Sequence, residues 1–64
     1  MELGDEWHEI LGRVIDLLDR ARLSTSEQEF LESMQERLEQ YKSRTYMSEA
    51  QHAWLELIEE KYNG

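Results

Sequence analysis

Residues 3–21, LGDEWHEILGRVIDLLDRA, place an apolar side chain at nearly every third or fourth position. This spacing is the period of an α-helix that buries one face. The apolar side chains cover an arc of roughly 160° of the helix surface. Charged residues occupy the opposite side, namely Asp5, Glu9, Arg13, Asp16 and Arg20. The sequence therefore predicts an amphipathic helix over residues 5–22.

Two further helices are predicted, and each begins at a serine. Ser24 with Glu27, and Ser48 with Gln51, have the spacing of a capping box, in which each side chain bonds the other residue's backbone N–H. Apolar residues then recur at helical spacing, which predicts helices over residues 25–42 and 49–62. Short connections make neighbouring helices antiparallel. We expect a single all-α domain over residues 1–64, a small three-helix bundle made of a helical hairpin and an N-terminal amphipathic helix.

Length and charge narrow the classes of function. Sixty-four residues suffice for one small domain, and the chain has no cysteine for a disulfide. Fifteen acidic residues against seven basic ones give a net charge of -8, which opposes binding to nucleic acid and to anionic lipid. The acidic N-terminus differs from a basic targeting peptide, and no apolar run is long enough to span a bilayer. We expect a cytoplasmic protein that contacts neither nucleic acid nor membranes directly.

Two carboxylate-x-x-histidine pairs, Asp5 with His8 and Glu49 with His52, have the spacing found in di-iron helical bundles. Such sites also need glutamates from two more helices, and His52 falls nearly opposite the apolar stripe of its own predicted helix. Surface histidines are therefore the preferred interpretation. The serines lie at predicted helix starts, and the chain has no glycine-rich phosphate loop. We expect no catalytic residue, no metal and no cofactor.

Acidic residues follow steps of three and four along two predicted helices. Carboxylates about 5–6 Å apart along a helix resemble the spacing of phosphates along a nucleic-acid strand. Such a face would fit a basic groove that normally holds DNA or RNA. The alternative is an ordinary solvated face, with acids near helix starts favoured by the helix dipole. The predicted partner-binding residues are Glu32, Glu36, Glu39, Glu49, Glu56 and Glu59.

Apolar residues at the edges of two predicted helices suggest a different function, self-association. Exposed apolar edges on a small core favour association, although burial within the bundle is the commoner fate of such residues. The candidates for a homodimer contact are Ile15, Leu17, Leu55 and Tyr62. Trp7 and Trp54 are predicted to be core anchors.

The pattern of residues 23–38 returns over residues 47–62, with LSTSEQEFL (23–31) matched by MSEAQHAWL (47–55). Either two capped helices have converged on one pattern, or a unit has been duplicated. The segment from Leu23 to Tyr62 resembles a helical hairpin of small phage- and prophage-encoded proteins. The resemblance consists of caps and core positions and supplies no catalytic or binding residues. It implies an early phage protein that binds a host factor in the host cytoplasm, a class that includes anti-CRISPR inhibitors.

These observations lead to two hypotheses. The first is a small acidic, non-enzymatic protein that blocks or sequesters a basic nucleic-acid-handling protein of the host, as a DNA mimic or an anti-defence inhibitor would. The second is a self-associating homodimeric structural or assembly module.

Overall fold

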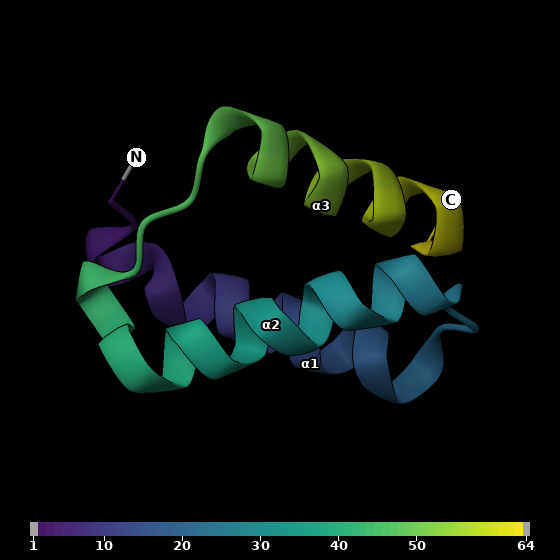
Figure 1. Cartoon of the computed structure of the whole chain (residues 1–64), viewed down its shortest axis with the longest axis horizontal. Helices are drawn as coiled ribbons and strands as arrows, with labels where there is room; N and C mark the ends of the chain where they lie inside the picture. The colour runs from purple at the N-terminus through teal and green to yellow at the C-terminus, as the bar shows by residue number, and fades with distance from the viewer. Residues whose placement is uncertain (1, 64) are drawn as a thin grey trace.

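The computed structural model describes residues 2–63, which form three α-helices: α1 (Trp7–Arg20), α2 (Thr25–Tyr41) and α3 (Glu49–Asn63) (Figure 1). A short 3-10 helix, η1 (Gly4–Glu6), precedes α1, and a second one, η2 (Lys42–Arg44), follows α2. Within residues 2–63 the only β-type pairing is an isolated antiparallel bridge between Glu2 and Tyr46. The predicted all-α three-helix bundle is confirmed.

The helices alternate in direction along the chain, and α1 and α2 make the closest backbone approach. In Figure 1, α3 lies along the outside of the α1–α2 pair and returns antiparallel to α2. The contact with α3 is made through long side chains rather than through close backbones.

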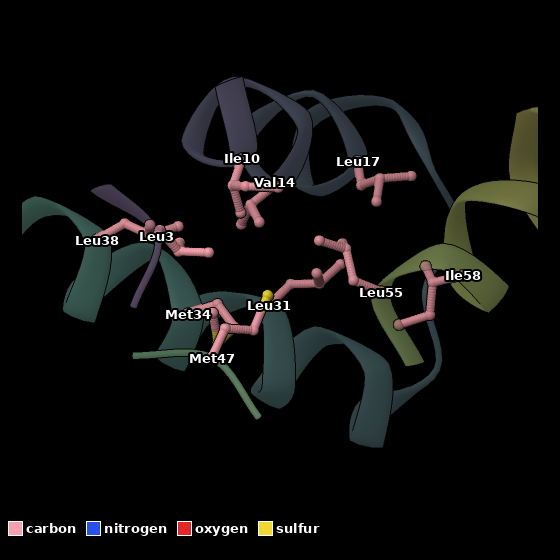
Figure 2. Packing of buried hydrophobic residues seen from close by; sticks show 10 residues of the cluster. All are labelled: Leu3, Ile10, Val14, Leu17, Leu31, Met34, Leu38, Met47, Leu55 and Ile58. Atoms are coloured by element: carbon pink, nitrogen blue, oxygen red, sulfur yellow. The ribbon is translucent and has the colours of Figure 1, made fainter. Parts of the chain in front are cut away.

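A single apolar core lies between the three helices (Figure 2). Each helix contributes residues of its apolar stripe to this core. Burial of a large aliphatic side chain stabilises the fold by about 1.5–3 kcal/mol. Two pairs of positions that match in the two sequence units are buried alike, since Leu31 and Leu55 are fully buried and Met34 and Ile58 are each 1% exposed. The buried hydrophobic residues are Leu3, Ile10, Val14, Leu17, Leu31, Met34, Leu38, Met47, Leu55 and Ile58.

Both predicted capping boxes are formed. At the start of α2, the Ser24 N–H donates to Glu27 Oε1 (2.9 Å) and the Glu27 N–H donates to Ser24 Oγ (3.2 Å). At the start of α3, Ser48 and Gln51 make the same two bonds at 2.9 and 3.2 Å. Each box satisfies two backbone donors that a helix start leaves unpaired.

The helix ends differ from the predicted bounds where the backbone leaves the helical region. The first helix was predicted over residues 5–22, but α1 ends at Arg20 because Ala21 is extended (φ -86°, ψ 146°). Its predicted start falls in η1, whose Gly4 has φ +58°, a conformation that favours glycine. The second helix stops at Tyr41, one residue early, because Lys42 takes φ 52° and ψ -122°. The third extends to Asn63.

The N-terminal residues are held against the connection between α2 and α3. The Leu3 N–H donates to the Thr45 carbonyl at 2.9 Å, and the side chain of Leu3 enters the core. Thr45 is itself buried and donates from Oγ1 to the Arg37 carbonyl at 3.3 Å. These bonds join residues 2–3, the end of α2 and the connection into one corner of the bundle.

Candidate acidic binding surface

The acidic residues predicted on α2 lie on its outer side. Glu32, Glu36 and Glu39 are exposed, while the buried face of α2 is formed by Leu31, Met34 and Leu38. Gln35 Nε2 donates to Glu39 Oε1 at 2.9 Å, and no cation within residues 2–63 pairs with these three glutamates. We call Glu32, Glu36 and Glu39 the α2 acidic row.

On α3 the predicted residues divide into two groups. Glu49 and Glu56 are exposed, and Glu56 Oε1 lies 3.5 Å from His52 Nδ1. Glu59 instead accepts two bonds from the Arg13 guanidinium, with Arg13 Nε 2.8 Å from Glu59 Oε2. Both side chains of this pair are mostly buried, so Glu59 joins α3 to α1. Of the residues predicted to bind a partner on α3, Glu59 is thus paired within the fold, whereas Glu49 and Glu56 are exposed.

The basic residues explain why the acidic surface is uncompensated. Three of the seven Lys and Arg side chains pair with carboxylates outside the α2 acidic row: Arg13 with Glu59, Arg20 with Asp16, and Lys61 with Glu27. The hydrogen bond that Arg13 donates to Glu59 raises the pKa of Arg13, and the nearby charges of Glu9 and Glu56 raise it further.

Two of the four predicted self-association residues are buried. Leu17 is 3% exposed and Leu55 is fully buried, so the expectation of exposed edges is wrong for both. Tyr62 packs on the core and places its hydroxyl 2.9 Å from Glu27 Oε1. Ile15 alone of the four is well exposed, at 43%. In an apolar arc of about 160°, a residue at the edge can be either buried or exposed. The type of an apolar side chain does not show which of the two occurs.

The sequence interpretation missed an apolar surface on α3. Trp54, predicted as a core anchor, is 38% exposed and stacks on Phe30 of α2 with ring centroids 4.4 Å apart. Leu57 is 63% exposed, and Ala50 and Ala53 are exposed as well. These four residues have the spacing i, i+3, i+4, i+7 and share one helix face. We call Ala50, Ala53, Trp54 and Leu57 the outer strip. The spacing of these four residues is visible in the sequence and could have been used to predict the strip.

The most densely bonded carboxylate in the fold is Glu27. It is buried, accepts from the Ser24 N–H and lies 3.5 Å from Lys61 Nζ. The backbone hydrogen bond from Ser24 lowers the pKa of Glu27, and the Tyr62 hydroxyl and the Lys61 charge lower it further. A carboxylate held ionised by three partners, Ser24, Tyr62 and Lys61, is suited to joining the start of α2 to the end of α3.

The two histidines sit in separate surroundings. His8 packs against Trp7, with ring centroids 3.7 Å apart, and His52 lies beside Glu56. No group of three or more His, Asp or Glu side chains in residues 2–63 is placed to hold a metal ion.

Across the same residues, none of the helices combines the length and the apolar character needed to cross a bilayer. Comparison with protein-family models finds no match, and comparisons with curated proteins and with solved structures find none either. The surface of the bundle is therefore the basis for assigning a function.

Proposed function

We propose that the chain is a small, non-enzymatic binding protein whose exposed glutamates bind a basic surface of a nucleic-acid-handling protein. The observation that carries the proposal is the α2 acidic row, which faces solvent with no cation paired to it in residues 2–63. Glu49 and Glu56 of α3 add to this surface, whereas Glu59 does not.

The positions of the three glutamates favour a role in binding a partner over a role in stabilising the fold. Glu36 and Glu39 lie in the second half of α2, where the helix dipole disfavours negative charge. Their side chains bond neither backbone caps nor the other helices, so their neutralisation leaves the fold intact. Glutamates three and four positions apart on a rigid helix present charge at a fixed spacing.

The size and charge of the chain are those of a protein that blocks a site built for nucleic acid. In the host-directed form of the proposal, suggested by the resemblance to phage hairpins, the target is a host defence nuclease or a related enzyme. Electrostatic complementarity of this kind speeds association and weakens with salt, because ions screen exposed charges.

The test is an affinity capture from nuclease-treated bacterial lysate with three baits, each eluted by a salt step. The native chain is compared with a triple Gln variant at Glu32, Glu36 and Glu39. The control carries Asp5→Asn, Glu6→Gln and Asp19→Asn, so that both variants lose three negative charges and change the net charge from -8 to -5. We expect the native and control baits to retain one nucleic-acid-handling protein that the row variant loses. Equal capture by all three baits, or elution that ignores salt, would contradict the proposal.

A second candidate function, self-association as an assembly module, is favoured by the exposure of Ile15 and of the outer strip. It predicts a molar mass of twice the 7.7 kDa monomer and a Tm that rises with protein concentration. Light scattering over a hundredfold range of concentration decides it, since a constant monomer mass rules it out.

A further inference from the structure

The outer strip of α3 is an apolar surface on the outside of an otherwise strongly acidic bundle. It includes Leu57, which is 63% exposed, and Trp54, which is 38% exposed and stacks on Phe30. Burial of the other face of α3, through Leu55 and Ile58, leaves the strip without a role in the core. Exposed apolar surface of this kind marks an interaction site more often than chance exposure of single residues does.

A row of glutamates runs along one border of the strip. Glu49, Glu56 and Glu60 are exposed and, with Ala53, follow the spacing i, i+4, i+7, i+11 on α3. We call these three glutamates the α3 acidic row. Lys61 is the single Lys or Arg in α3, and it pairs with Glu27. The strip and the row are therefore parallel, and both follow the helix axis.

A hollow lies where the strip and the row meet. It has a volume of about 330 Å³ and is lined by Met47, Ser48, Glu49, His52, Ala53 and Glu56. Its lining combines the apolar residues Met47 and Ala53 with the acidic residues Glu49 and Glu56. A long cationic side chain fits such a place, with its methylene stem over the alanine and its charged end between the carboxylates.

We infer that α3 is the docking site of a basic amphipathic helix of the partner. The apolar face of that helix covers the outer strip, and its Lys and Arg side chains pair with Glu49, Glu56 and Glu60. This inference rests on the proposed function and deepens it, since it names the element of the basic partner that is recognised. An amphipathic helix presents anchors at i, i+3, i+4 and i+7, which is the spacing of the strip itself.

Charge favours this occupant over a second copy of the chain. Two copies paired along α3 by a twofold axis would bring two chains of net charge -8 together. Their α3 acidic rows would then border a shared interface, and like charges there are unfavourable. A basic amphipathic helix covers the apolar strip and also pairs its cations with the α3 acidic row.

The probe is an 18-residue synthetic peptide with leucines at i, i+3, i+4, i+7 and lysines at the remaining helical positions. A second peptide of identical composition distributes the leucines around the helix. Binding of each labelled peptide to the full chain is measured by fluorescence anisotropy at two salt concentrations. We expect the amphipathic peptide to bind at least tenfold more tightly than its rearranged counterpart, since only it presents an apolar face.

Matched variants separate docking on α3 from general attraction to an acidic chain. The Trp54→Gln, Leu57→Gln double variant is compared with Ile15→Gln, which changes an exposed apolar residue on α1. The triple Gln variant of the α3 acidic row is compared with the Asp5→Asn, Glu6→Gln, Asp19→Asn variant, because each removes three negative charges. We expect about a tenfold loss of affinity for the two α3 variants and less than a threefold loss for the two controls.

A further variant tests the strip without removing any side chain that could stabilise the fold. Ala53→Gln fills the strip with an extended side chain and removes no core contact, since Ala53 is exposed. We expect native helicity by circular dichroism and weakened peptide binding.

Each contrary result has a separate meaning. Equal losses from the α3 acidic row variant and its charge-matched control, with native binding by the strip variants, overturn α3 as the docking site but leave an acidic binding protein in place. Binding that is insensitive to the α3 acidic row and to salt, yet is lost when Trp54 and Leu57 are changed, contradicts the proposed function and the basic partner together. A native dimer that becomes a monomer when Trp54 and Leu57 are changed assigns the strip to a second copy and overturns the inference.

Discussion

The hydroxyl of Tyr62 lies 2.9 Å from the carboxylate of Glu27, and this contact joins the last turn of α3 to the first turn of α2. The same hydroxyl lies 2.7 Å from the carbonyl oxygen of Arg22, so its one proton is shared between two acceptors. The C-terminal helix is thereby attached to both the start of α2 and the segment that precedes it.

Tyr62→Phe removes this attachment and keeps the ring. The Glu27 carboxylate and the Arg22 carbonyl each lose a donor, so we expect the Tm to fall by about 5 °C in a domain of this size. Tyr41→Phe is the control, because Tyr41 is 54% exposed. Thermal unfolding followed by circular dichroism measures both variants. Equal Tm values for the two would show that the Tyr62 hydroxyl adds nothing to stability.

The stability of the bundle is expected to depend on the ionisation of Glu27. The bonds from Ser24, Tyr62 and Lys61 lower the folded-state pKa of Glu27 below its ordinary value of 4.5. The resulting stabilisation is complete above pH 4.5 and is lost as the pH falls through the folded-state pKa. Glu27→Gln keeps a capping oxygen, as Gln51 does in α3, but cannot ionise. The advantage of the native chain over this variant in urea unfolding should shrink between pH 7 and pH 3; parallel stability curves would contradict this.

The Arg13–Glu59 pair is expected to stabilise the α1–α3 contact. Both side chains are mostly buried, and the guanidinium uses two nitrogens on one carboxylate. A double-mutant cycle with Arg13→Ala and Glu59→Ala should give a coupling free energy of about 1 kcal/mol in urea unfolding. Coupling of the same size between Arg13 and the exposed Glu56 would argue that charge in general, and not this pairing, is responsible.

Lys42→Gly is expected to stabilise the chain. Lys42 ends α2 with φ 52° and ψ -122°, a region in which a side chain is strained and glycine is not. The free energy gained by relief of this strain exceeds the entropic cost of fixing a glycine on folding. The net effect is a free energy of unfolding that is about 1 kcal/mol larger. Lys42→Ala removes the same charge without the relief and serves as the control. A gain for the alanine variant equal to that for glycine would assign the effect to charge.

The features that the sequence predicts are those encoded locally. Ser24 with Glu27 and Ser48 with Gln51 interact three positions apart, so their pattern identifies both helix starts. Helical periodicity likewise identifies the core stripe of each helix, since it concerns residues on one face. The α2 acidic row was also placed correctly on an outer surface, because steps of three and four residues keep these acids on one side of α2, away from the apolar stripe.

The missed features depend on how the helices are placed against each other. Arg13 and Glu59 are 46 positions apart, and no local pattern pairs them. Leu17 and Ile15 lie at opposite edges of one apolar arc, and only the position of the neighbouring helices buries the first and exposes the second. Trp54 was assigned to the core by its residue type, whereas α3 is apolar on two sides and buries the side that carries Leu55.

The backbone of α3 makes fewer close approaches to the other helices than α1 and α2 make to each other, and this has a consequence for the motions of the chain. Segments with few close contacts open locally at a smaller free-energy cost than the whole fold. The backbone amides of α3 should therefore exchange their hydrogens with deuterated solvent sooner than those of α1 and α2. A ligand bound to α3 would slow the exchange of the α3 amides more than that of the α1 and α2 amides. Slower exchange in α3 alone would therefore show that the ligand is bound there.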